Sequence, residues 1–446
     1  MTDLQIWITL GVFATVILTI AFDVLDMTVA TVLGATILYA LGILNSMDIQ
    51  AAVDTSGGTL ALLFGGMVVA RTLAVTGIFE RIGSVLLQAT GGSGKRYLFL
   101  LIAMVAPVCA FLPNATTVIL LAPVIIRVAK SLDTDFVAPM VLAAIISNSA
   151  GLLTLVGDPA TFLVGSSIGM SFATYLKTVS VGGLLCLLAS IPLLPLVMRD
   201  VWRVRRVLPP PEPARPLEKP WFAVLALGTL AVMVVLFLLG ELLPNPILPP
   251  TAAIIGAALS LLTVYAVKVE PVDNLLRDID WKTLVFLFSI FCLVQGVTRT
   301  GLLQSLSVKM NIWFGSDVTV VAFLLLGGIA LLSSVLANIP VVAASILMTK
   351  GYLVAAEIVP EAALATDFTD WPRAAIPVFI AMMFGATLGG NATLIGASAN
   401  VASAGICAAH GKRVSFARFA RYGLPFTACQ LAVAALYVLW LVSASG

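Results

Sequence analysis

Long apolar segments occupy most of the chain, and short polar stretches separate them. The segment from Phe222 to Leu239, for example, carries no charged residue and does not alternate between polar and apolar positions. A helix needs about 20 apolar residues to cross a hydrocarbon core roughly 30 Å thick, whereas the strands of a membrane barrel alternate over about ten residues. The pattern therefore predicts an all-α polytopic membrane protein.

We expect about ten transmembrane helices in two sets of five. In the first half they lie near 4–22, 27–44, 59–79, 137–168 and 178–198, and in the second half near 221–240, 251–267, 283–303, 376–408 and 423–443. No positive charge precedes the first segment, so we expect a retained helix rather than a signal peptide. One further apolar stretch lies between the third and fourth helix of each set, at 97–130 and 318–350.

Each of these further stretches is interrupted in the middle by an asparagine with a proline within two residues of it. Asn114 follows Pro113 in the first stretch, and Asn338 stands 224 residues later, in the run Leu336-Ala337-Asn338-Ile339-Pro340. Basic residues flank the first stretch at both ends, which favours a re-entrant hairpin over two crossings. Interrupted hydrophobic segments at matching places in two halves point to the binding site of a secondary transporter.

The fourth helix of each set contains a second break. Gly, Asn, Ser and Pro weaken or end helices, and they gather between Ser147 and Pro159 and again between Thr387 and Gly396. Thr154 and Thr393 take matching places in the two runs. Because backbone polar groups cannot face lipid unsatisfied, all four breaks must be buried in protein or line a cavity. We expect two hairpin tips and two broken helices to enclose one central pocket.

Neutral amides and hydroxyls form the predicted lining of this pocket. Half-helix N-termini attract anions and polar oxygens, while unwound carbonyls with amide or hydroxyl side chains can hold a cation or a neutral hydroxyl ligand. Close helix packing explains each small residue taken singly, but their clustering at matched breaks favours a site. The candidate substrate- or ion-binding residues are Asn114, Thr116, Thr117, Asn148, Thr154, Asn338, Asn391, Thr393 and Asn400.

Asp158 is the one charged residue in these breaks. An aspartate at mid-membrane costs roughly 2.5 to 3.5 kcal/mol on insertion scales, so it needs a partner or a purpose. A buried carboxyl favours its protonated form, and a proton site here would couple transport to the proton gradient. Asp158 before Pro159 also fits a helix N-cap, and the two roles are compatible. Its counterpart is Ala397, so the proton-coupling role would belong to the first half alone.

The expected organisation is two inverted repeats, residues 1–198 and 221–446, joined by a basic, proline-rich linker at 199–220. Five crossings per half reverse the second repeat relative to the first. If both termini lie outside and the linker is cytoplasmic, our count places eighteen of the 24 Lys and Arg residues on the cytoplasmic side. This bias follows the positive-inside rule and predicts a multi-pass protein of the plasma (inner) membrane.

Composition excludes several other classes of protein. Residues are 60% hydrophobic and only 10% charged, against roughly 25% charged in soluble domains. The net charge of +2 offers no face for nucleic acid, the five cysteines lack metal-type spacing, and the single histidine, His410, cannot build a metal site. We expect no enzymatic activity, no metal and no cofactor. The expected partners are the lipid bilayer and a small inorganic or organic solute, with a homodimer left open.

Three runs resemble signatures of the ion transporter superfamily. They are Leu112-Pro113-Asn114-Ala115-Thr116-Thr117, Val156-Gly157-Asp158-Pro159-Ala160-Thr161 and Gly389-Gly390-Asn391-Ala392-Thr393-Leu394-Ile395-Gly396-Ala397-Ser398-Ala399-Asn400. The superfamily includes arsenite efflux permeases, the melanosomal P protein, sodium/proton antiporters and, more remotely, divalent anion/sodium symporters. The later two runs look most like the arsenite permease and P protein branch. The resemblance implies two inverted repeats with a scaffold and a transport domain that moves as an elevator.

Secondary active transport is therefore the expected function. The first choice is efflux of arsenite or antimonite in exchange for protons, because Asp158 offers a proton site in an otherwise neutral pocket. A sodium/proton antiporter, or a sodium-coupled anion carrier of the dicarboxylate type, is the alternative; the coupling ion is H⁺ or Na⁺. A channel is less favoured, since Pro113-Asn114-Ala115 matches a water-channel tripeptide in the first half only. Ala160 and Thr161 depart from the branch pattern and leave the substrate open.

Overall fold

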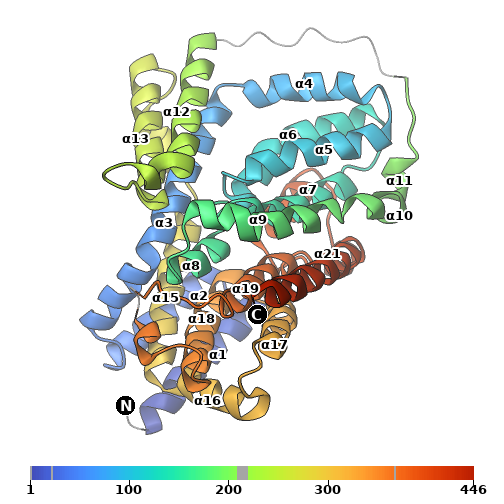
Figure 1. The fold of residues 1–446 in the computed structure, drawn as a ribbon. Coiled ribbons are helices and arrows are strands. Elements are labelled where there is room, and N and C mark those ends of the chain that lie inside the picture. Colours follow the sequence, from blue (N-terminus) through green and yellow to red (C-terminus); the bar gives the residue numbers. More distant parts are fainter. Residues whose placement is uncertain (1–2, 22–23, 208–218, 366–367, 446) are drawn as a thin grey trace.

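The computed structural model describes residues 3–21, 24–207, 219–365 and 368–445 (Figure 1). Over these ranges the chain is helical, and the one β-type pairing is an isolated bridge between Ser93 and Arg205. Nine of the described helices are long and apolar enough to cross a membrane. The expected all-α polytopic fold is confirmed.

The order of elements in the first half recurs in the second, so that α12, α13 and α15 to α21 follow one another as α1 to α9 do. The first-half helices are α1 (Asp3–Ala21), α2 (Met27–Ala40), α3 (Ser46–Val75), α4 (Ile78–Thr90), α5 (Gly94–Cys109), α6 (Asn114–Ser131), α7 (Val137–Ala150), α8 (Pro159–Ser167), α9 (Phe172–Leu188), α10 (Leu194–Val197) and α11 (Arg199–Trp202). The second-half helices are α12 (Pro220–Leu239), α13 (Pro249–Val267), α14 (Val272–Arg277), α15 (Trp281–Arg299), α16 (Leu302–Phe314), α17 (Val318–Ser333), α18 (Asn338–Ala355), α19 (Ile376–Gly389), α20 (Ser398–Ala409) and α21 (Phe416–Ser445).

All four helix breaks lie where the sequence predicts them. The first predicted hairpin is α5 and α6, which are separated at residues 110–113, and the second is α17 and α18, which are separated at residues 334–337. The two broken helices are α7 with α8 and α19 with α20. Asn114 and Asn338 are the first residues of α6 and α18, so each asparagine begins the second arm of its hairpin.

Other boundaries differ from the prediction. The third helix begins at Ser46 rather than near 59, because Asn45 and Asp48 form a capping box that starts α3 there. The third helix ends at Val75 rather than near 79, because Gly77 takes a left-handed conformation with φ of 71°. The fifth helix begins at Phe172 rather than near 178. Residues 208–218 of the predicted linker lie outside the described residues.

Two helices, α4 and α16, were not predicted. Each has 13 residues and follows a left-handed glycine, Gly77 with φ of 71° or Gly301 with φ of 73°. Such helices are too short to form a 20-residue apolar run, which is why the hydrophobic pattern passes over them. The matching glycines join the crossing helix to the short helix, which in turn leads to the hairpin, in both halves.

The helices form two groups (Figure 1). In one group α13 packs along α3, and α15 packs against both α2 and α3. In the other group, which holds the hairpins and the broken helices, α17 packs along α19 and α5 along α7. The second half of each broken helix packs against helices of the other repeat: α20 packs against α6 and α7, while α8 packs against α18 and α19. Each hairpin therefore contacts a half-helix from the opposite repeat.

Ion pairs show that α3 and α15 run antiparallel. Arg71, near the C-terminal end of α3, pairs with Asp278 just before α15 at 2.8 Å. Arg299, at the C-terminal end of α15, pairs with Asp48 in the first turn of α3 at 2.6 Å. Each helix thus ends where its counterpart begins, which is the arrangement that inverted copies require.

A further ion pair ties the start of α7 to the region before and within α21. Asp135 accepts from Lys412 Nζ at 2.9 Å and from Arg418 Nη2 at 2.7 Å. Burial disfavours the charged form of Asp135, but the hydrogen bonds from Lys412, from the Val137 amide and from Arg418 outweigh that effect, and the pKa of Asp135 lies below its usual value.

Candidate transport site

The tip of each hairpin lies over a glycine in a broken helix. A Cβ atom placed on Gly151 would stand 3.5 Å from Nδ2 and 3.6 Å from Oδ1 of Asn114. A Cβ atom placed on Gly390 would stand 3.3 Å and 3.1 Å from the same two atoms of Asn338. The sequence alignment that pairs Gly151 with Gly390 is thus matched by the contacts that the two glycines make.

Two threonines fasten the unwound segments to the hairpins. Thr154 donates its hydroxyl to the carbonyl of Ala110, where α5 has just ended, and Thr393 donates to the carbonyl of Ser334, where α17 has just ended. Both threonines were candidate binding residues. In this conformation their hydroxyls hold the backbone of the breaks in place.

Glycines let the same segments approach the hairpins closely. A Cβ atom on Gly157 would lie 2.9 Å from the carbonyl oxygen of Gly151 and 3.0 Å from that of Cys109. A Cβ atom on Gly396 would lie 3.0 Å from the carbonyl oxygen of Ser333. Because Cys109 and Ser333 are equivalent positions, both breaks are built with the same backbone geometry.

A buried amide network joins the two broken helices. Asn148 of α7 donates through Nδ2 to Oδ1 of Asn391 and to Oδ1 of Asn400, at 3.1 Å each. Asn391 donates to Ser149 Oγ and to Gln430 Oε1 at 2.9 Å, and Asn400 donates to the carbonyls of Gly390 and Thr393. The three predicted asparagines are thus brought together, with their amides bonded to protein groups.

Gln430 of α21 completes this network and was not among the predicted residues. Its amide nitrogen donates to Ser149 Oγ at 2.8 Å and to Ser190 Oγ at 2.9 Å, and the residue has no exposed surface. Polar side chains inside membrane helices commonly bond across to neighbouring helices. A lone glutamine in the apolar run of α21 was the signal that could have identified it.

The two hairpin asparagines differ in what their carbonyl oxygens accept. Ser333 Oγ lies within hydrogen-bond distance of two acceptors, Oδ1 of Asn338 and the carbonyl oxygen of Ala386, which share its one proton. The equivalent position in the first half is Cys109, and Oδ1 of Asn114 is buried with no hydrogen-bond partner among the described residues. Of the neighbouring candidates, Thr117 is buried and Thr116 is partly exposed. The carbonyl oxygen of Asn114 at the first tip therefore lacks a described donor, whereas that of Asn338 at the second tip has the Ser333 hydroxyl beside it.

Asp158 caps α8 and reaches across to the other repeat. It is 4% exposed, accepts from the Ala160 amide at 3.2 Å through Oδ1, and accepts from the Thr387 hydroxyl at 2.9 Å through Oδ2. The capping interpretation is confirmed, with Pro159 at the first helical position. Asp158 also lies beside Gly151, the glycine under the first tip, since a Cβ placed on Gly151 would stand 2.8 Å from the Cβ of Asp158.

One helix begins at each of the four breaks: α6, α8, α18 and α20. Asp158 caps α8, but no described side chain caps α6, α18 or α20, which follow Pro113, Ala337 and Ala397. An uncapped N-terminus leaves backbone N–H groups free and carries partial positive charge. The first half thus combines the uncapped N-terminus of α6 with the carboxylate of Asp158 at α8, whereas the second half has two uncapped helix ends at its breaks and no carboxylate there.

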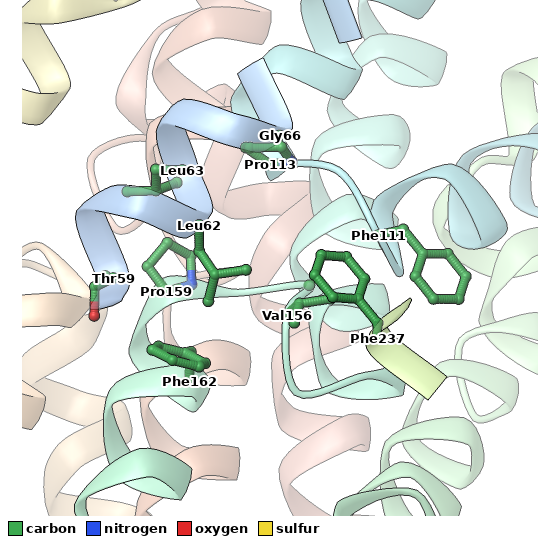
Figure 2. Close-up of a pocket in the computed structure, with 11 residues that line it drawn as sticks. Thr59, Leu62, Leu63, Gly66, Phe111, Pro113, Val156, Pro159, Phe162 and Phe237 are labelled. Carbon is green, nitrogen blue, oxygen red and sulfur yellow. The ribbon is translucent and has the colours of Figure 1, made fainter. Parts of the chain in front are cut away.

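A small cavity lies where the first hairpin tip meets α3 (Figure 2). In Figure 2 Leu62 and Leu63 of α3 stand on one side of it and the rings of Phe111 and Phe237 on the other. Its volume of about 10 Å³ is close to what one water molecule needs. Thr59 also lines it, with a buried hydroxyl that has no partner among the described residues. In this conformation the site is closed to a larger solute.

Comparison with known proteins identifies related membrane transporters. A family model described as citrate transporter (CitMHS) matches residues 16–366. An uncharacterized transporter of Synechocystis sp. is 43% identical over 440 residues, which cover 97% of both chains. An uncharacterized transporter of Mycobacterium bovis is 30% identical over 439 residues, covering 96% of this chain and 97% of the relative. The mouse P protein is 27% identical over 98% of this chain and 60% of its own length.

Proposed function

Because the chain belongs to the citrate transporter (CitMHS) family of the ion transporter superfamily, we propose that it carries a small carboxylate-type anion together with a coupling cation. Transport would be secondary active, with the domain that holds the hairpins moving as an elevator against the α3–α13–α15 group. The carrier class rests on the family; the substrate and the coupling are our proposal.

The asymmetry between the two breaks is the observation that carries this proposal. Uncapped N-termini of α18 and α20 border the second break, and such helix ends favour carboxylate or phosphate oxygens. Asp158 and the unpartnered carbonyl oxygen of Asn114 flank Gly151 at the first break, and oxygen ligands of this kind favour a proton or a sodium ion. An anion and a cation would thus bind at neighbouring positions and neutralise each other inside the membrane.

Arsenite or antimonite efflux in exchange for protons is the second candidate. The neutral amides and hydroxyls at the breaks suit a neutral trihydroxide, and Asp158 would then carry the exchanged proton. A sodium/proton antiporter would use the same carboxylate without an organic solute. These alternatives differ in what binds at the second break, so substrate flux separates them.

The closed cavity at the first tip supports an alternating-access mechanism. A space of about 10 Å³ holds no organic anion, since small-molecule sites usually measure about 300–1,000 Å³. Release of a solute would therefore require the first hairpin and the loop around Gly157 to separate from α3. Thr59 and Phe237, which line the cavity from outside the hairpin domain, would lie on the surface exposed by that motion.

For the orientation, we propose a plasma (inner) membrane protein with two inverted repeats, both termini outside and the central linker cytoplasmic. The antiparallel course of α3 and α15 supports the inversion. A homodimer is compatible with this arrangement.

Flux in proteoliposomes tests the substrate and the coupling together. Under an imposed pH or sodium gradient, citrate, succinate, arsenite and sodium alone are offered in turn. We expect a carboxylate to accumulate with the gradient. Gradient-driven arsenite movement would establish the second candidate instead, and the absence of coupled movement for all four would overturn the proposal.

Asp158→Asn separates coupling from capping. Asparagine caps helices as well as aspartate does and keeps an oxygen for the Thr387 hydroxyl, so the protein should insert and remain folded. We expect gradient-driven accumulation to be lost. Accumulation at the wild-type level would leave Asp158 with the capping role alone.

A further inference from the structure

The first residue of α9 is held by two side chains that lie outside the hairpin domain. The carboxylate of Glu241 accepts the backbone N–H of Phe172 at 3.2 Å through Oε1 and at 3.0 Å through Oε2. The ring of Phe172 stacks on the ring of Phe237, with the centroids 6.4 Å apart and the planes 15° from parallel. Phe237 lies at the end of α12 and Glu241 lies four residues later, in the turn Gly240–Leu242, so the two side chains share one face.

These contacts cross the boundary between the two groups of helices. Helix α12 packs against α13 and α3, whereas α9 packs against α7 and α21. The two stacked rings are buried, with Phe172 1% and Phe237 2% exposed. Contacts of this kind must break whenever the hairpin domain moves against the α3–α13–α15 group.

Glu241 supplies an acceptor that the hairpin domain does not provide for itself. The N-terminus of a helix carries free N–H groups and partial positive charge, which attract a carboxylate. Ser171 accepts from the Thr174 amide at 3.1 Å, and the Phe172 amide is left to Glu241. None of the ion pairs within the described residues includes Glu241, so its charge is directed at the end of α9.

The turn that carries Glu241 is closed by its own backbone. The Ile247 amide donates to the carbonyl of Gly240 at 2.9 Å. A Cβ atom on Gly240 would lie 2.6 Å from the carbonyl oxygen of Ile247, so only glycine lets the chain fold back this closely. The carboxylate is therefore presented to α9 from a fixed position on the α3–α13–α15 group.

The same contacts adjoin the cavity at the first hairpin tip. Phe237 lines this cavity together with Thr59 of α3 and Phe111 of the tip (Figure 2). Because α9 packs against α7 within the hairpin domain, a motion that draws the tip away from Thr59 also draws Phe172 away from Phe237 and Glu241.

We propose that Glu241 and Phe237 form a latch that holds the hairpin domain in this closed conformation and sets how often the site opens. The inference rests on the elevator motion in the proposed function, but it does not depend on which solute or ion is carried. Loss of the latch increases the population of open conformations and leaves the binding residues unchanged.

The reaction of a cysteine at position 59 with N-ethylmaleimide measures how often the site opens. Thr59 is 1% exposed, so Thr59→Cys reacts only when the hairpin domain has moved away from α3, and the protein without this substitution gives the background from the native cysteines. A hydrogen bond to a charged acceptor corresponds to a factor of about ten or more, so we expect Glu241→Ala to label about ten-fold faster. Asp317→Ala removes a carboxylate that caps α17 within one domain and should label at the parent rate.

Two substitutions at Phe172 separate the amide from the ring. Proline is favoured at the first position of a helix and has no N–H, and the preceding Ser171, with φ of −67° and ψ of 154°, already has a conformation that proline allows. Phe172→Ala and Phe172→Pro both lose the ring, but only Phe172→Pro loses the donor. We expect Phe172→Pro to label about ten-fold faster than Phe172→Ala when Glu241 is present, and the two to label equally when each is combined with Glu241→Ala.

The outcomes separate the latch from the rest of the account. Equal labelling of Glu241→Ala and its parent, at a measurable rate, would overturn the latch and leave the moving domain in place. A difference between Phe172→Pro and Phe172→Ala that persists in Glu241→Ala would also overturn it. No labelling of Thr59→Cys in any variant would overturn both the latch and the elevator motion. The expected labelling without coupled flux of any offered solute would contradict the proposed substrate and coupling alone.

Discussion

At the scale of single residues, the two halves differ by a few atoms at otherwise matching positions. The hydroxyl of Ser333 lies beside the carbonyl oxygen of Asn338, while Cys109 stands at the equivalent position in the first half and the carbonyl oxygen of Asn114 has no hydrogen-bond partner among the described residues. A buried acceptor without a hydrogen bond costs about 1–3 kcal/mol, so its persistence needs a compensating role. In our proposal, a coupling ion bound at the first tip would supply that role.

Cys109→Ser gives the first half the hydroxyl that the second half already has. The new donor should compete with the ion for Oδ1 of Asn114, and a net hydrogen bond of about 1 kcal/mol corresponds to roughly five-fold weaker apparent binding of the coupling ion. The measurement is the dependence of transport rate on ion concentration. Cys186→Ser, another fully buried thiol in the same domain, is the control. Equal ion dependence in both variants would contradict the assignment.

The helix breaks that carry the candidate residues could be predicted, but the hydrogen-bond partners of those residues could not. Asn114, Asn338, Thr154 and Thr393 interrupt hydrophobic runs at matching intervals, which a single sequence reveals. The threonine hydroxyls bond to the carbonyls of Ala110 and Ser334. These contacts depend on how the hairpins fold back onto the broken helices, and no local sequence pattern encodes that.

At the scale of elements, the contact between α3 and the first hairpin depends on one glycine of a pair, Gly66, whereas Gly65 faces Ala253 of α13. Gly65 and Gly66 lie in the middle of α3, where glycine weakens a helix. A Cβ on Gly66 would stand 2.9 Å from Cδ of Pro113, which is too close for a ring fixed to the backbone. The glycine therefore lets the hairpin tip pack directly on α3.

Gly66→Ala should slow transport by about ten-fold while leaving insertion intact. The added methyl overpacks the closed state, and overpacking typically costs 1–3 kcal/mol. Initial uptake rates normalised to protein in the membrane measure the effect. Gly57→Ala lies on the same helix with open space around its new Cβ and should transport normally. Similar rates in the two variants would show that the Gly66 contact has no part in the cycle.

Hydrophobic runs predicted the crossing helices and hairpins well, but not α4 and α16. Their length of 13 residues falls below what a membrane crossing needs, so the runs gave no sign of them. The only local signal was the glycine before each helix, Gly77 or Gly301. The two glycines stand at matching positions in the halves, but a glycine alone does not indicate that a short helix follows.

At the scale of the whole molecule, the two repeats are joined through their broken helices. The network of Asn148, Asn391, Asn400 and Gln430 links α7, α20 and α21, and Asp158 links α8 to α19. Since these groups are buried and bonded to one another, the hairpin domain should move as one body.

Gln430→Leu tests how firmly the repeats are joined. It keeps a similar volume but leaves one N–H of Asn391 without its acceptor and removes the donor to the hydroxyl oxygens of Ser149 and Ser190, which costs about 1–3 kcal/mol. We expect a lower thermal unfolding midpoint in detergent. Gln88→Leu, at an exposed site on α4, should leave the midpoint unchanged. A midpoint for Gln430→Leu equal to that of the wild type would contradict the joining role.

The most direct test of the two-tip site is transport by Asn114→Ala and Asn338→Ala in proteoliposomes, each compared with wild type at equal amounts of inserted protein. Both asparagines lie over the glycines of the broken helices, so the account predicts that either variant inserts normally and loses transport. Wild-type rates in both variants would show that the paired hairpin tips do not form the site.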